Sequence, residues 1–452
     1  MKRILAKWGK PVLFLLGLLL LTLALQPLFK IRDPRPKEYM SGFYLEKQGA
    51  LDGVFIGGSS VYTFWQAPLA FRQSGITVYP VSVPNMPQRA TLDLIKECRR
   101  TQPDALYILC INQFGRTDVQ PAYIHNTLDF MPITGRKPSM IPKLSALAGL
   151  EGLDMLEFFL PILRFHSTWS TVNKEDVFPK RRGYKGGYDG YTFRNYEKDV
   201  SDKYWTSDDI ADLAGSYQEE TLTELCDYLE EEQIRTLFVC FPQAIGDQVT
   251  VLNGVREYVR NRGFEVLDLY NHSDTLNLDC ANDYSDRRHV NIHGAAKTTK
   301  GLLQYLLAHY SFADKRTDPS YRDWNEAADK YLHFISRYAL DYELDFRNRT
   351  LELAPVAFSK AERKGDEVLL EWERCEGAAG YVLFRKLARK GEWTRIAELS
   401  AEELSYREEV PEHTYRSTYL IVPVAEEQGT KLYGRLHMEN KVLLKGDLST
   451  EK

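Results

Sequence analysis

The sequence has few cysteines, and none of them are spaced for metal or redox chemistry. Six cysteines occur among 452 residues, and no pair of them has the two-residue gap that zinc and thioredoxin-like motifs need. We therefore expect no metal site and no cofactor, and nothing in the sequence requires a disulfide. Cys110 and Cys240 fall inside apolar runs, where a thiol behaves as a small buried hydrophobe.

The chain also lacks an excess of positive charge. Its formal net charge is -5 and its pI is near 6.1, so it has no basic field to neutralise phosphates, which argues against a nucleic-acid partner. Charged residues make up 27% and hydrophobic residues 44% of the sequence, values that are typical of folded proteins. The length is enough for two or three domains.

A long uncharged run lies at the N-terminus. Residues 11–29 read PVLFLLGLLLLTLALQPLF, which as a helix spans about 28 Å at about 1.5 Å per residue. We expect residues 1–38 to form a single-pass anchor in the cell membrane and a linker. The short basic stub before the run favours an extracytoplasmic position for the rest of the chain. A cleaved signal peptide and a buried core helix remain alternatives, although the first needs a clearer cleavage site and the second a polar stripe.

Residues 39–312 alternate between apolar strands and helices. Runs that read as buried strands lie at 53–56, 76–83, 105–111, 236–241 and 265–269. Helical spacing occurs at 91–100, 212–232 and 249–262, and Asn291 reads as the cap of a last helix. This alternation predicts an α/β domain whose parallel sheet is covered on both faces.

The strand and helix rhythm is lost in residues 121–205. We interpret this segment as an insertion over the sheet, near the ligand site. It contains an apolar helix candidate at 147–163 and a Gly- and Tyr-rich stretch at 181–191. Two interpretations are open for His166 and Trp169 in this segment. They line a pocket, or they are packed side chains without a functional role.

The C-terminal part changes composition. A helical linker is expected over 313–352, and short alternating strands follow at near-regular spacing over 353–445, which predicts an antiparallel sandwich. Trp372, the pair Gly380 and Tyr381, and Tyr415 with Tyr419 resemble a fibronectin type III module. The resemblance implies a spacer or binding platform.

Two short segments carry groups for nucleophilic chemistry. One is FIGGSSVY at 55–62, and the other is DYSDRRHVNIHGAAKTT at 283–299. A serine hydroxyl is a weak nucleophile at neutral pH unless an imidazole, oriented by a carboxylate, accepts its proton. Ser59, His289 and Asp286 can supply these three roles. Ser60 is a competing nucleophile if the turn is read one residue later, and His293 is a competing base with the wrong spacing from Asp286.

Together these segments resemble the SGNH/GDSL hydrolase family. In that family the serine follows the first strand in a Gly-x-Ser turn, and the acid and base share a late Asp-x-x-His unit, as Gly57 to Ser59 and Asp286 to His289 do here. The resemblance implies a flavodoxin-like three-layer sandwich with a parallel sheet. The sequence blocks that supply hydrogen-bond donors to the oxyanion hole in that family are altered in this chain. Asn85 and Asn112 are the nearest candidates for these donors.

The resemblance is stronger to a membrane-tethered branch of the family, whose members take part in alginate acetylation and in D-alanyl transfer to teichoic acid. It implies a serine esterase or O-acyltransferase that acts on cell-envelope glycans through an acyl-serine intermediate. It also implies a cell-surface polysaccharide as partner, with a multi-spanning membrane acyltransferase beside it. The alternative is an inactive surface protein that binds glycans or other proteins.

Overall fold

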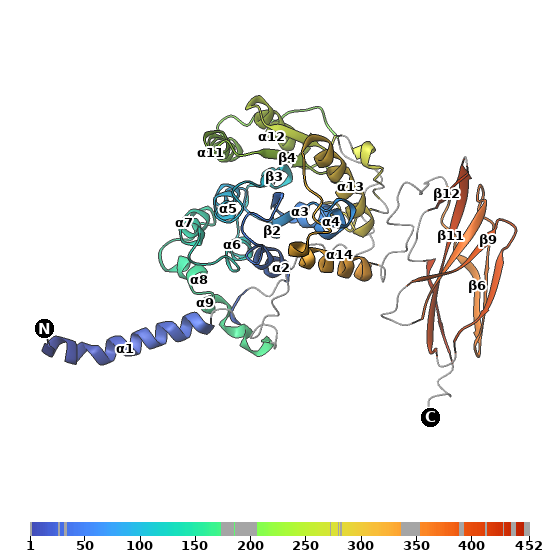
Figure 1. The fold of residues 1–452 in the computed structure, drawn as a ribbon, viewed down its shortest axis with the longest axis horizontal. Coiled ribbons are helices and arrows are strands. Elements are labelled where there is room, and N and C mark those ends of the chain that lie inside the picture. Colours follow the sequence, from blue (N-terminus) through green and yellow to red (C-terminus); the bar gives the residue numbers. More distant parts are fainter. Residues whose placement is uncertain are drawn as a thin grey trace.

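The computed structural model describes most of the chain (Figure 1). The described residues are 2–25, 28–30, 34–172, 185, 206–271, 273–278, 280, 283–335, 353–387, 393–411, 414–427, 429–434 and 440–446. Most of the Gly- and Tyr-rich stretch at 181–191, and the second half of the expected linker, therefore lie outside them.

The N-terminal run forms helix α1 (Lys2–Leu25), with Pro11 inside it. Several of its apolar side chains are exposed, among them Phe14 and Leu13. The membrane-spanning helix that we expected over 11–29 is not found. α1 ends at Leu25, and no helix within the described ranges is both long and apolar enough to cross a membrane.

A five-stranded parallel sheet forms the centre of the first domain. Its strands are β1 (Gly53–Gly57), β2 (Val78–Ser82), β3 (Leu106–Cys110), β4 (Thr236–Cys240) and β5 (Glu265–Asp268). They follow the order β2-β1-β3-β4-β5, a doubly wound order in which the chain reverses direction across the sheet between β1 and β3. All residues of β1, β2 and β3 are buried, as near-continuous apolar strands in a covered parallel sheet should be.

Two groups of helices lie on the two sides of this sheet (Figure 1). One group consists of α5 (Ala90–Cys98), α11 (Tyr217–Glu231) and α12 (Val249–Asn261). The other consists of α3 (Ser59–Phe64), α4 (Ala67–Ser74), α13 (Ile292–His309) and α14 (Arg322–Ile335). The prediction of an α/β domain with a parallel sheet is confirmed.

The linker region contains a helix that the sequence did not suggest. α2 (Pro34–Phe43) contacts β2, and its residues Tyr39, Met40 and Phe43 are buried. Its sequence, PRPKEYMSGF, is rich in proline and charge, so the three buried side chains outweigh its weak helical propensity. Residues 34–38 of the expected linker therefore begin a helix that packs against β2.

The insertion consists of short helices in its described part. They are α6 (Pro121–Leu128), α7 (Lys137–Leu147), η3 (Gly152–Met155), α8 (Leu156–Phe159), α9 (Ile162–Phe165) and η4 (His166–Thr171). The apolar helix expected over 147–163 is divided because Gly149 and Gly152 take φ values of 68° and 57° and Pro161 precedes α9. Further on, the buried Lys185 forms ion pairs with Glu46 and, at 2.6 Å, with Asp323.

Shorter 3-10 turns complete the first domain: η2 (Ile111–Gly115), η5 (Ser273–Leu276) and η6 (Pro319–Tyr321). All six cysteines are free thiols, and all are buried. Cys110 and Cys240 lie on β3 and β4 with no exposed surface, as their apolar surroundings predicted.

The C-terminal domain is an antiparallel β-sandwich with its own core. Its strands are β6 (Phe358–Lys364), β7 (Glu367–Trp372), β8 (Gly380–Lys386), β9 (Thr394–Ser400), β10 (Ser405–Glu409), β11 (Arg416–Glu427), β12 (Thr430–Tyr433) and β13 (Val442–Lys445). One sheet has the order β10-β7-β6, and the other β12-β11-β8-β9 with β13 paired to β11. Trp372, Tyr381 and Tyr419 are buried between them, whereas Tyr415 is 44% exposed. The predicted sandwich is confirmed.

Candidate active site

Ser59 lies where the first strand passes directly into a helix. β1 ends at Gly57 and α3 begins at Ser59, so the serine is at the carboxyl edge of the sheet. β1 and β3 are neighbours, and in this strand order the reversal between them is where open α/β sheets bind ligands. The topology therefore places Ser59 in the position that a ligand site of this sheet would use.

The turn before Ser59 depends on a glycine at position 57. A Cβ atom on Gly57 would lie 2.6 Å from Cγ2 of Val61 and 2.7 Å from Cβ of Cys110, both far inside normal contact distance. A Cβ on Gly58 would meet nothing closer than 3.9 Å. Gly57 thus allows α3 and β3 to approach the end of β1, and this close packing fixes the start of α3 and the serine on it.

His289 and Asp286 are held by a short loop before α13. Tyr284 and Val290 form an isolated antiparallel bridge across this loop, and the N–H of Ser285 donates to the carbonyl of His289 at 2.8 Å. The loop passes into α13 through Asn291, whose Oδ1 accepts from the N–H of Gly294 at 3.2 Å. The predicted cap is therefore confirmed, and it places the loop against the start of the last helix.

A buried ion pair supports the same loop. Lys297 of α13 donates to Oδ2 of Asp283 at 2.5 Å and to the carbonyl of Asn277 at 2.6 Å. The side chains of Asp283 and Lys297 are 0% and 3% exposed. Removing one partner of such a pair would leave an uncompensated buried charge, so the pair resists movement of the loop.

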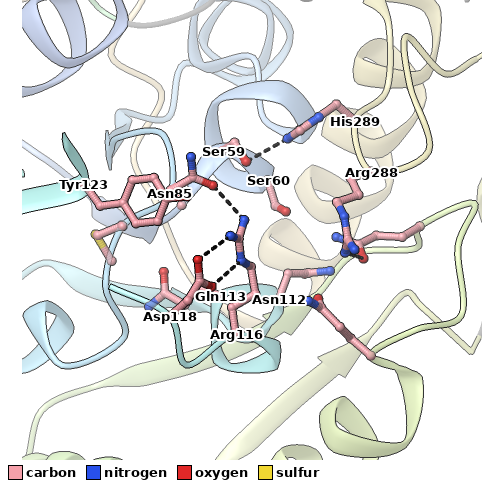
Figure 2. Close-up of a pocket in the computed structure, with 14 residues that line it drawn as sticks. Ser59, Ser60, Asn85, Asn112, Gln113, Arg116, Asp118, Tyr123, Arg288 and His289 are labelled. Carbon is pink, nitrogen blue, oxygen red and sulfur yellow. Dashed lines mark hydrogen bonds and ion pairs between the residues drawn. The ribbon is translucent and has the colours of Figure 1, made fainter. Parts of the chain in front are cut away.

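Ser59, His289 and Asp286 form a continuous hydrogen-bonded chain. Nε2 of His289 lies 2.7 Å from Oγ of Ser59, and Nδ1 lies 2.9 and 2.8 Å from the two carboxylate oxygens of Asp286. An ionised carboxylate only accepts hydrogen bonds, so the Nδ1 nitrogen carries the ring proton and Nε2 is left to accept from the serine hydroxyl. Figure 2 shows the histidine ring pointing at Ser59. This arrangement prepares Ser59 to lose its proton to His289.

Asp286 stays ionised because its hydrogen bonds outweigh its burial. Burial raises the pKa of this carboxyl, but hydrogen bonds from the His289 ring and from the backbone N–H groups of Arg288 and His289 hold the pKa below its ordinary value. Those N–H groups donate to Oδ1 at 2.8 and 2.9 Å. The loop thus fixes both the charge and the direction of the carboxylate.

The two predicted oxyanion residues lie beside the serine and differ in their surroundings. The Asn112 amide pairs with the backbone of Phe241: its Nδ2 donates to the carbonyl and its Oδ1 accepts from the N–H, both at 2.8 Å. An amide nitrogen has two hydrogens, so one N–H of Asn112 is left for the cavity that it lines.

Asn85 occupies a turn next to Ser59. Its φ of 52° is in the left-handed region, which asparagine enters more readily than most residues other than glycine. The backbone nitrogen of the next residue, Met86, lies 3.9 Å from the Cβ position that Gly58 leaves empty. Asparagine therefore adopts here the kind of backbone conformation that glycine favours, and the turn lies against Gly58.

These residues share one pocket of about 90 Å³. It is lined by Gly58, Ser59, Ser60, Asn85, Met86, Asn112, Gln113, Arg116, Asp118, Tyr123, Gln243, Gln248, Arg288 and His289 (Figure 2). Sequence reasoning missed the cationic, glutamine and tyrosine members, which come from loops, from η2 and from α6. One signal was available: Arg288 lies inside the Asp-x-x-His unit, and Arg116 comes shortly after β3.

Ser60 lines the pocket, but Nε2 of His289 is hydrogen-bonded to Ser59. The side chain of His293 lies outside the described part of the structure, as does that of Trp169. His166 is exposed, and its Nδ1 is 3.1 Å from the carbonyl of Leu163. It does not line the pocket.

Comparison with known proteins adds little. No family model matches the chain, and no curated protein matches it. Among solved structures, pectate lyase PelI from Erwinia chrysanthemi aligns at 18% identity and a TM-score of 0.17, over 20% of this chain and 27% of the lyase.

Two further solved structures are fibronectin type III domains. A Fn3-like protein from Clostridium thermocellum aligns at 21% identity and a TM-score of 0.16, over 21% of this chain and 94% of its own. An FN3 domain of human collagen XX aligns at 12% identity and a TM-score of 0.17, over 22% of this chain and 95% of its own. Because these scores are so low, the alignments carry no conclusion about function.

Proposed function

We propose that this chain is an SGNH-type serine esterase or O-acyltransferase that acts on acyl esters of cell-envelope glycans through an acyl-Ser59 intermediate. The observation that carries the proposal is the hydrogen-bonded chain from Ser59 through His289 to Asp286, with distances of 2.7 and 2.8 Å. The strand order and the place of Ser59 at the carboxyl end of β1 support the flavodoxin-like arrangement that this family implies.

The chain of three side chains suits acyl transfer by general base catalysis. Oγ of Ser59 attacks the ester carbonyl as its proton passes to Nε2 of His289, and Asp286 stabilises the imidazolium that forms. The ester C–O bond then breaks, and the proton on Nε2 goes to the leaving alcohol. A water or a sugar hydroxyl next gives its proton to His289 and attacks the acyl-serine, which releases an acid or a new ester and restores Ser59.

Negative charge on the carbonyl oxygen needs donors in the pocket. The spare N–H of Asn112 and the backbone N–H groups at the start of α3 and in the Asn85–Met86 turn are the nearest candidates, since the first N–H groups of a helix have no partner within it. One such donor contributes about 3 to 4 kcal/mol to the transition state when it is well placed.

The setting of this chemistry is part of the proposal. We place the chain at the cell membrane, on the extracytoplasmic side, with a polysaccharide or another acylated glycan as substrate and a multi-spanning acyltransferase as a partner. The apolar N-terminal run and the family resemblance support this setting. The C-terminal sandwich, with its fibronectin type III resemblance, is proposed to bind the glycan or a partner protein.

A non-catalytic binding protein is a second candidate, and one observation favours it. The Asn112 amide is already paired on both of its polar atoms with Phe241, so the side-chain donor of the oxyanion site is partly engaged. In that case the pocket would hold an acylated glycan without turning it over.

Turnover by the wild-type protein in an aryl acetate assay distinguishes the two candidates, and substitution at four positions tests the triad. Ser59→Ala and His289→Ala should each abolish turnover, because these groups act as a unit, whereas Asp286→Asn should be milder, since the imidazole stays but loses its orientation. Ser60→Ala tests the register of the turn. Complete loss in Ser60→Ala with retained activity in Ser59→Ala would move the nucleophile to Ser60, and wild-type rates in all four variants would reject the triad.

A further inference from the structure

Arg288 brings a positive charge to the pocket from inside the loop that carries the candidate acid and base. It directly precedes His289, and its side chain lines the same pocket as Ser59 (Figure 2). The side chain is 30% exposed, so a ligand in the pocket can reach it. Acyl transfer as described above gives this residue's side chain no role.

The guanidinium of Arg288 has donors to spare. It forms an ion pair with Asp247 and a long contact of 3.4 Å with Oε1 of Gln243, both from the loop after β4. A guanidinium has five N–H groups, and these contacts use two of them. Asp247 is 47% exposed, and an exposed ion pair of this kind contributes only about 0–1 kcal/mol, so a bound anion can compete with it.

The second arginine of the pocket is arranged differently. Arg116 donates to both carboxylate oxygens of Asp118 at 3.0 and 2.9 Å and to Oδ1 of Asn85 at 2.9 Å. These contacts hold it against the Asn85 turn, so its role is to position that turn. Among the lining residues Asp118 is the one carboxylate, against two arginines. Each arginine therefore has one carboxylate partner, Asp118 for Arg116 and Asp247 for Arg288, and Arg288 is the one that keeps more of its N–H groups unused.

We propose that Arg288 forms an anion subsite, which receives a carboxylate or phosphate group of the molecule that carries the acyl ester. The planar fork of arginine matches both oxyanions with two parallel hydrogen bonds. The substrate class of the proposed enzyme is then an acylated anionic glycan rather than a neutral one. This inference rests on the proposed function for its place in catalysis, but the anion site itself can be tested without turnover.

Matched substrates test it in the full chain. Wild-type protein should hydrolyse 4-acetoxybenzoate and 4-acetoxyphenyl phosphate with a kcat/KM about tenfold above that of the neutral 4-acetoxybenzamide, the size of one charge-assisted hydrogen bond. The larger of the two anionic ratios identifies carboxylate or phosphate as the natural group. Arg288→Gln should bring both ratios close to one, and Arg288→Lys should keep part of the preference. Arg262→Gln is the control, because Arg262 pairs with Asp227 and Glu230 and does not line the pocket.

Binding of the unreactive anions benzoate and phenyl phosphate, followed by ligand-detected NMR, separates the two hypotheses. Anion binding that is lost in Arg288→Gln and strengthened in Asp247→Asn, in a protein that hydrolyses no acetate, would refute the enzyme and keep the subsite. If wild type hydrolyses the anionic and neutral esters with nearly equal kcat/KM, and Arg288→Gln does not change this, the subsite is refuted and the enzyme is kept. If the wild-type protein binds neither anion, the proposed subsite is also refuted.

Discussion

Replacing Gly57 by alanine should destabilise the first domain by overpacking. The new methyl carbon would lie 2.6 Å from Cγ2 of Val61 and 2.7 Å from Cβ of Cys110, whereas carbon atoms pack best at about 3.5 to 4.0 Å. Val61 and Cys110 are both fully buried, on α3 and β3, so neither can move into solvent. Extra methyl groups in tight cores cost about 1–3 kcal/mol, and we expect Gly57→Ala to fall in the upper half of that range.

Gly58→Ala is the matched control for this substitution. Its added carbon would meet nothing closer than 3.9 Å, and its φ of -78° suits any residue, so its free energy of unfolding should change by less than about 0.5 kcal/mol. Urea unfolding followed by circular dichroism at 222 nm reports mainly on the helices of the first domain. With a typical m value, Gly57→Ala should lower the midpoint by about 1 M. Equal midpoints for the two variants would refute the packing argument.

Four further predictions follow from other parts of the chain. Asn112→Ala should lower the free energy of unfolding by about 1–3 kcal/mol, because it leaves the buried backbone of Phe241 unpaired; a neutral result in urea unfolding would argue against the pairing. The folded-state pKa of Asp286 is lowered, so the stability that its ionised form provides is complete above about pH 4 and is lost as the pH falls through the folded value. Asp286→Asn should thus lower the Tm more at pH 7 than at pH 3, and an equal loss at both would contradict the assignment. A fragment of residues 353–446 should fold alone with an all-β circular dichroism spectrum, and a helical spectrum would count against it. Finally, deletion of residues 1–29 should move the protein from the membrane fraction to the soluble fraction, whereas an unchanged distribution would end the prediction of an anchor.

The sequence was sufficient to predict the strands that carry the site, because fully buried parallel strands read as short apolar runs. The run at 53–56 became β1, and the unit from Asp286 to His289 did meet Ser59 across 230 positions of sequence. The cap at Asn291 was also visible, since its role depends on local geometry alone. Local patterns therefore predicted both segments that bring Ser59, His289 and Asp286 together.

The pocket wall could not be predicted in the same way. Arg116, Gln243 and Arg288 come from separate loops, and loops have no periodicity that reveals where a side chain points. The pairing of Asn112 with Phe241 joins residues 129 positions apart and depends on the register of β3 against β4. Helix α2 was missed because its stability comes from burial against β2, and a proline- and charge-rich sequence gives no sign of that contact.

The most direct test of the account is labelling of the full chain with a fluorophosphonate probe, followed by mass spectrometry of its peptides. Only a serine whose proton has an acceptor reacts readily with such a probe. The account predicts a single adduct on Ser59 that disappears in His289→Ala. An adduct on Ser60, or an unlabelled Ser59 in folded wild-type protein, would contradict it.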